Sequence, residues 1–258
     1  REVDMPNKKD ITTKSNTTVS PIMDDILNSA GEGINYDTNE LQIPFIRAIQ
    51  ALSPQIKKSD PQYIDGASQG DLFNTVTGEF WTGEEGVVVI PCYQETKYLE
   101  FVPRDQGGGF VGEIEVDSPV LSQTTRDRSV EMLPSGNQLV KSDQHYCMVL
   151  NDDGSAQPAI IDMKSSALKI SRRWKTQIAM FKIQDKDGNF KQPALFATKW
   201  RIKTVEESNE LGTWYNLNVE KVDLVDSKAL FDEAKSFRSS VMKGEAKAVS
   251  ENQEDTPF

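Results

Sequence analysis

Cationic and aromatic residues are interleaved in two segments of the second half of the chain. The first segment is Arg172-Arg173-Trp174-Lys175, with Lys169 just before it, and the second is Lys199-Trp200-Arg201-Ile202-Lys203. Cations attract phosphate groups and aromatic rings stack on nucleobases, so this mixture is typical of surfaces that bind single strands. The two segments therefore predict a binding site for a single-stranded nucleic acid.

A purely structural role for the same residues is the alternative. In a strand, Lys199, Arg201 and Lys203 point to one face and Trp200 to the other, where it would belong to the core. Trp174 lies on the apolar stripe of a predicted helix and is equally compatible with the core. The cations are also compatible with an ordinary solvated face.

Four further aromatic residues flank a glycine-rich loop, Gly107–Gly109. We expect at least one of them to stack on a base. They are Tyr93, Tyr98, Phe101 and Phe110.

The distribution of charge favours a localised site. The chain of 258 residues has a net charge of −11, which by itself argues against nucleic acid. Residues 160–204, however, contain eleven Lys and Arg residues and three Asp residues, a net charge of +8 that leaves −19 for the rest. The sequence thus describes one basic region within an acidic chain.

The spacing of apolar residues predicts a mainly β (α+β) fold with one or two helices. Strand patterns separated by turn residues have the spacing of a strand-rich barrel or sandwich. A helix is predicted from Ser165 or Ser166 to Phe181, and a second from Asp226 or Ser227 to Gly244. The predicted strands are 86–93, 96–102, 145–150, 157–163, 194–205 and 213–222.

The predicted domain organisation has three parts. Residues 1–20 are polar and form a disordered N-terminal arm, residues 21–243 form a single β-rich globular domain, and residues 244–258 form a flexible acidic tail. Pro21–Leu27 is expected to form a short amphipathic helix.

No catalytic residue, metal or cofactor is predicted, and we expect a protein that is not an enzyme. Asp152-Asp153 and Asp185-Lys186-Asp187-Gly188 are better explained by turns than by a calcium loop. Cys92 and Cys147 are expected to be buried thiols in a reducing compartment. With no apolar segment of membrane-spanning length or leader, the sequence predicts a cytoplasmic protein without a membrane partner.

The last residues carry a distinctive pattern of acids and one terminal aromatic ring. An acidic peptide that ends in an aromatic residue can place that ring in a pocket on a partner. The ending resembles the C-terminal tip of bacterial and phage single-stranded DNA-binding proteins. The segment consists of Glu254, Asp255, Thr256, Pro257 and Phe258, and Thr256 stands where the bacterial tip has an aliphatic residue.

Three internal stretches look like phage-encoded proteins of this kind: Asn74–Glu79, Pro91-Cys92-Tyr93, and Phe101–Arg104 with the glycine loop. The resemblance implies an elaborated OB fold that coats and protects single-stranded DNA in phage replication or recombination. It also implies a tail that recruits replication or recombination proteins. A homo-oligomer is compatible with the sequence. The alternatives are a virion structural or decoration protein and an enzyme of DNA metabolism.

Overall fold

The computed structural model describes residues 21–29, 32–33, 42–127, 130–210 and 212–246. The chain divides into two units, Arg1–Asp37 and Thr38–Phe258. In the first unit the predicted short helix is present as α1 (Pro21–Asn28). The predicted N-terminal arm and residues 247–258 of the predicted tail lie outside the described residues.

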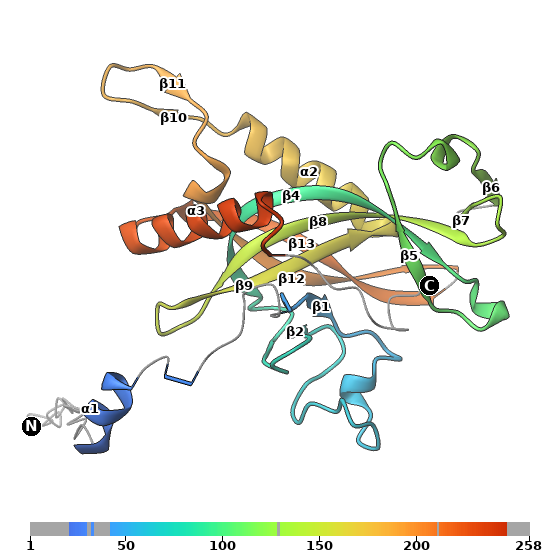
Figure 1. Cartoon of the computed structure of the whole chain (residues 1–258), viewed down its shortest axis with the longest axis horizontal. Helices are drawn as coiled ribbons and strands as arrows, with labels where there is room; N and C mark the ends of the chain where they lie inside the picture. The colour runs from blue at the N-terminus through green and yellow to red at the C-terminus, as the bar shows by residue number, and fades with distance from the viewer. Residues whose placement is uncertain (1–20, 30–31, 34–41, 128–129, 211, 247–258) are drawn as a thin grey trace, which may run out of the picture. The chain divides into compact units, whose positions relative to one another are not determined.

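The second unit is built on an antiparallel sheet of eight strands (Figure 1). Its central path runs in the order β13-β12-β4-β8-β7-β6, with β5 beside β4 and β9 beside β8. The strands are β4 (Val87–Phe101), β5 (Phe110–Ile114), β6 (Thr125–Asp127), β7 (Val130–Met132), β8 (Gln138–Leu150), β9 (Ala156–Lys164), β12 (Thr198–Asn209) and β13 (Gly212–Leu224).

Two helices and several small elements complete the unit. The helices are α2 (Leu168–Met180) and α3 (Lys228–Met242). A small sheet contains β1 (Ile46–Ala48), β2 (Leu72–Asn74) and β3 (Phe80–Trp81), and a hairpin contains β10 (Ile183–Gln184) and β11 (Phe190–Lys191). Single 3-10 turns are η2 (Pro54–Ile56), η3 (Arg104–Gln106), η4 (Pro119–Ser122), η5 (Ser165–Ala167) and η6 (Leu195–Ala197).

The mainly β fold with helices is confirmed, but the sheet is not closed into the expected barrel. Within the described residues, the strand path ends at β13 and β6. One reason is that β12 pairs with β4 only from Ile202↔Val87 to Trp200↔Val89 and then leaves it. The small sheet packs on the main sheet through the buried Ile46 and Leu72, and Phe45, just before β1, forms an isolated bridge with Ile160 of β9.

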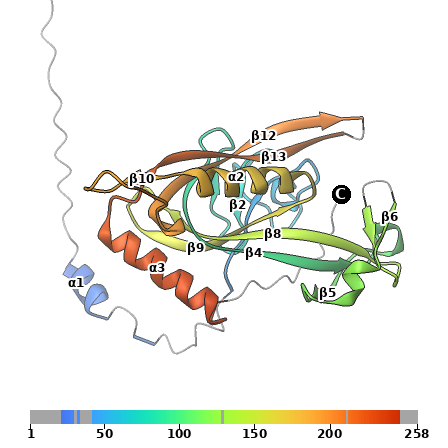
Figure 2. The ribbon, with the colours of Figure 1, turned by 90° about the horizontal axis from the view of Figure 1, so that it is seen from above.

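Helix α2 lies between the two halves of the curved sheet. Figure 2 shows β12 and β13 on one side of α2 and β4, β8 and β9 on the other. Buried residues from both halves pack with Trp174 of α2 in one apolar cluster, among them Trp200, Cys147 and Ile161. The other face of β4 and β8 is covered by α3, where Ala234 packs with Ile90, Cys92 and Met148.

The ends of the helices follow their sequence signals only in part. Ser227 caps α3 as predicted, because its Oγ accepts a hydrogen bond from the Leu230 N–H. Neither Ser165 nor Ser166 caps α2, since the η5 turn precedes the helix. The hydroxyl of Ser166 instead accepts a hydrogen bond from Asn216 Nδ2.

Candidate nucleic-acid interface

The two tryptophans of the predicted site are core residues. Trp174 is 0% exposed and Trp200 is 1% exposed, and their rings meet edge to face with centroids 6.0 Å apart. The apolar stripe of α2 and the inward face of β12 bring them together. The prediction that they stack on bases is corrected: neither ring is available to a ligand, and both hold α2 against the sheet.

Beneath α2, a buried polar network joins the helix to β8. Ser171 Oγ donates to Asp143 Oδ2 at 2.7 Å and is hydrogen-bonded to His145 Nε2 at 2.9 Å. Because the single hydroxyl proton goes to Asp143, the imidazole of His145 must donate through Nε2–H. Lys175 Nζ and Thr96 Oγ1 also donate to Asp143, at 2.7 and 2.8 Å. These contacts fix the position of α2 on the sheet.

The network also sets the charges of its members. Burial alone would raise the pKa of Asp143, but hydrogen bonds from Lys175, Ser171 and Thr96 outweigh it and hold the pKa below its ordinary value. Burial lowers the pKa of His145 to about 3, and the nearby Asp143 opposes this shift only partly. His145 is therefore neutral, and Lys175, one of the predicted DNA contacts, is an ion-pair partner of Asp143.

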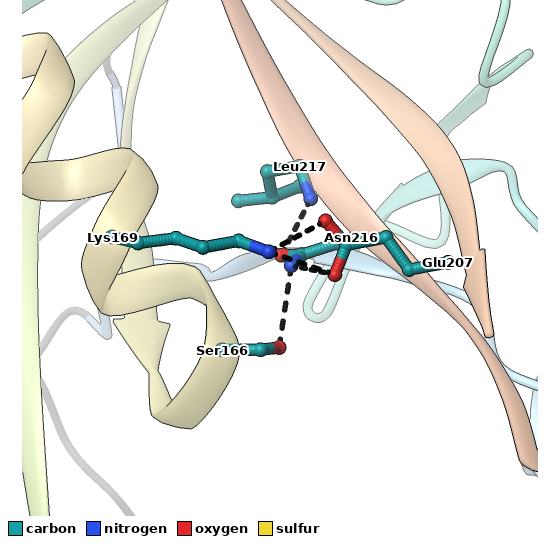
Figure 3. A network of polar contacts seen from close by, with 5 residues as sticks. All are labelled: Ser166, Lys169, Glu207, Asn216 and Leu217. Atoms are coloured by element: carbon teal, nitrogen blue, oxygen red, sulfur yellow. Dashed lines mark hydrogen bonds and ion pairs between the residues drawn. The ribbon is translucent and has the colours of Figure 1, made fainter. Parts of the chain in front are cut away.

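Lys169, another predicted DNA contact, forms an ion pair with Glu207 of the β12–β13 hairpin (Figure 3). Its Nζ lies 2.9 Å from Glu207 Oε1. Asn216 Nδ2 donates to Glu207 Oε2 at 3.0 Å and to Ser166 Oγ at 3.2 Å. The hydrogen bond from Asn216 and, to a smaller extent, that from Lys169 lower the pKa of Glu207. The Glu207 carboxylate therefore balances the charge of Lys169.

The cations of β12 lie on the opposite face of the strand from α2. Trp200 and Ile202 point toward α2, so the alternating residues Lys199, Arg201 and Lys203 point away from it. The two basic segments therefore do not form one surface, and the prediction that they share a site is corrected.

Each of the three β12 cations also has a partner. Lys199 pairs with Asp226 at 3.1 Å, and Lys203 pairs with Glu220 at 3.8 Å. Arg201 Nη1 donates to the Glu85 carbonyl at 2.8 Å. This row is consequently a weaker candidate for phosphate contacts than the sequence alone indicates.

Arg172 and Arg173 remain as exposed cations on the outer face of α2. In the part of the chain that the structure describes, neither guanidinium has an ion-pair or hydrogen-bond partner. Both side chains are therefore available to an anionic ligand.

Of the four other predicted aromatics, only Tyr98 is on the side of α2. Tyr98 lies two residues from Thr96 on the same face of β4, and its strand partner is Lys141 of β8. Tyr93 lies on the opposite face and packs against Tyr146, with ring centroids 6.0 Å apart.

The remaining two aromatics pack against one another. Phe101 is fully buried, and its ring centroid lies 5.5 Å from that of the half-buried Phe110. A stacking role for Phe101 is therefore corrected, because its ring contributes to a small core of its own.

Several exposed residues near α2 were not identified from the sequence. Lys141 is exposed two residues before Asp143 on the same face of β8. After α2, the exposed residues Lys182, Lys186 and Phe190 belong to the β10–β11 hairpin and its ends. The sequence signal for these residues was Phe190, an aromatic residue that follows the Asp187-Gly188 turn between two lysines, Lys186 and Lys191.

The turns interpreted as non-metal sites are confirmed as turns. Asp185 Oδ1 accepts hydrogen bonds from the N–H groups of Asp187 and Asn189. Asp153 Oδ1 accepts one from the Ser155 N–H in the same way. Across the described residues, no group of three or more His, Cys, Asp or Glu side chains is placed to hold a metal ion.

The predicted partner-binding residues Glu254, Asp255, Thr256, Pro257 and Phe258 lie outside the described residues. Among the helices of the described residues, none is long and apolar enough to cross a membrane. Both cysteines are buried free thiols, as expected.

Comparison with known proteins identifies a phage family. Residues 13–247 match the family described as Pam3 phage gp34-like protein, and the chain belongs to that family. No curated protein and no solved structure matches the chain. The family membership agrees with the expected phage origin.

Proposed function

We propose that this phage protein binds single-stranded DNA through the outer face of α2. The observation that carries the proposal is the exposure of Arg172 and Arg173, two adjacent guanidinium groups without partners among the described residues. Guanidinium groups bind phosphate oxygens in a bidentate geometry and are weakly hydrated, so they favour a phosphate backbone.

The surroundings of α2 support the same ligand. Residues 168–192 contain seven Lys and Arg residues and two Asp residues, a net charge of +5 in a chain of net charge −11. Exposed Lys141 and half-buried Tyr98 lie on the α2 side of β8 and β4, next to Asp143 and Thr96. A local basic strip within an acidic protein suits a narrow single strand better than a wide duplex.

The fixed position of α2 also favours binding. The network of Ser171, Asp143 and His145 and the packing of Trp174 hold the helix against the sheet. A rigid platform loses little conformational freedom when it binds its ligand. In this proposal the protein coats single-stranded DNA during phage replication or recombination, and its acidic C-terminal segment recruits partner proteins.

The direct test is fluorescence anisotropy with labelled oligo-dT and with a matched duplex, at about 50 mM and about 200 mM salt. We expect preferential binding to the single strand and a marked loss of affinity at the higher salt concentration. An absence of binding to both DNAs at low salt overturns the proposal. Assembly of the protein into particles or sheets under those conditions, seen by sedimentation, would then favour a virion structural protein.

A further inference from the structure

The β10–β11 hairpin displays a single aromatic ring to solvent. Phe190 is 68% exposed, although the hairpin around it is well defined by hydrogen bonds. Asp185 organises the turn through the N–H groups of Asp187 and Asn189, and Gly188 adopts a positive φ of 84°. Figure 1 shows the hairpin extending beyond the end of the main sheet. The turn thus presents Phe190 on an ordered element.

The hairpin is held against the rest of the protein at its base. Lys221 Nζ lies 3.2 Å from the centroid of the Phe181 ring, at the end of α2. Just after β11, Gln192 Nε2 donates to the Ile178 carbonyl at 3.4 Å. Both contacts lie at the end of α2, where the chain passes into the hairpin.

Exposed side chains connect the arginines to the hairpin. Met180, which is 75% exposed, follows Arg173 by seven residues and therefore lies on the same face of α2, about 10 Å along the helix. Lys182 and Lys186 are exposed, and neither has an ion-pair partner in the described part of the chain. The name α2–hairpin surface is used below for the exposed residues that follow one another along α2 and the hairpin: Arg172, Arg173, Met180, Lys182, Lys186 and Phe190.

We infer that Phe190 is the base-stacking residue of the α2–hairpin surface, and that Lys182 and Lys186 contact the neighbouring phosphates. This inference rests on the proposed function. Single strands are bound by aromatic rings set among cations, which is the arrangement here. Protein–protein interfaces also favour aromatic residues, Met and Arg but are depleted in Lys, so the exposed Lys182 and Lys186 favour a phosphate backbone over a protein partner.

The test uses Phe190→Ala in the full chain, with Val116→Ala as the matched control. Val116 is 65% exposed and lies in the segment that follows β5. We expect Phe190→Ala to weaken oligo-dT binding about 5- to 150-fold, equivalent to about 1–3 kcal/mol at about 1.4 kcal/mol per tenfold change. The salt dependence is expected to be unchanged because no phosphate contact is removed. Val116→Ala is expected to bind like the wild type.

A second variant reports on the ring directly. Phe190→Trp adds an exposed indole to four native tryptophans, of which Trp174 and Trp200 are buried and Trp81 and Trp214 half-buried. The wild type titrated in parallel supplies the native signal, so the difference between the two proteins reports on position 190. We expect oligo-dT to quench this added fluorescence. Wild-type affinity in Phe190→Ala, or no quenching in Phe190→Trp, overturns this inference alone if the wild type binds oligo-dT. Failure of the wild type to bind oligo-dT overturns the proposed function as well.

Discussion

Burial decides the roles of individual aromatic residues in this protein. Trp174 stacks on His145, with centroids 4.5 Å apart, and meets Trp200 edge to face. Phe190 has no such environment and faces solvent. Large aromatic side chains contribute most to stability where they are fully buried, and they are available to ligands only where they are not.

Replacement of Trp174 by Ala is expected to lower the free energy of unfolding by about 3–5 kcal/mol, because it leaves a cavity between α2 and the sheet. Urea denaturation followed by circular dichroism measures this change. Phe190→Ala serves as the control and is expected to alter stability little, since its ring is exposed. A loss below about 1 kcal/mol for Trp174→Ala would contradict the assignment of this residue to the core.

His145 is expected to make the protein less stable as the pH falls. Its pKa is about 3 in the folded protein and about 6.5 when exposed, so the unfolded chain binds the extra proton between these values. The free energy of unfolding therefore falls below pH 6.5, by up to about 1.4 kcal/mol per pH unit. Since His145 is the only histidine, urea midpoints at pH 7, 6 and 5 follow this loss of stability.

The control for this pH dependence is His145→Gln, which lacks a titrating ring. We expect the variant to lose clearly less stability than the wild type between pH 7 and pH 5. Equal losses in the two proteins would show that His145 is not held neutral by burial.

At the scale of elements, the cations of β12 and α2 are expected to behave differently. Lys199 and Lys203 are paired with acids and lie on the face of β12 that points away from α2. The double variant Lys199→Ala/Lys203→Ala is therefore expected to bind oligo-dT with wild-type affinity. Anisotropy titrations at low salt measure it, and a strong loss of affinity would place the interface on the β12 face instead.

Local sequence signals predicted elements better than their assembly. The stripe of Leu168, Trp174 and Ile178 predicted α2, and Ser227 marked the start of α3. The expected strands 86–93 and 96–102 are one strand, β4, because a bulge between Pro91 and Tyr93 keeps it paired with β8. The open sheet was not predictable, since strand closure depends on pairing between residues distant in sequence.

The same limit applies to the candidate site. Alternation in 199–203 correctly separates the cations from Trp200, but sequence spacing does not reveal that α2 packs on the tryptophan side. Ion pairs such as Lys169–Glu207 join residues far apart in the chain and were likewise invisible. Arg172 and Arg173 were among the candidate residues, but the sequence did not distinguish these exposed arginines from their paired neighbours.

For the whole molecule, the charge distribution bears on the role of the C-terminal segment. The acids Glu251, Glu254 and Asp255 contribute three of the negative charges of a protein of net charge −11. Deletion of Thr256–Phe258 is therefore expected to leave oligo-dT binding unchanged or slightly tighter, because the deleted residues offer no cation to phosphate. Anisotropy at low salt compares the two proteins, and loss of DNA binding would refute a partner-binding role for this segment.

The central claim is that α2 contacts the phosphates of a single strand. The most direct measurement is the salt dependence of oligo-dT affinity for Arg172→Ala/Arg173→Ala. The matched control is Lys57→Ala/Lys58→Ala, which removes two adjacent exposed cations elsewhere in the unit. If both arginines contact phosphates, the arginine variant binds more weakly and its slope of log K against log salt is shallower by about 1.4, while the control resembles the wild type. An arginine variant with wild-type affinity and slope would contradict the claim.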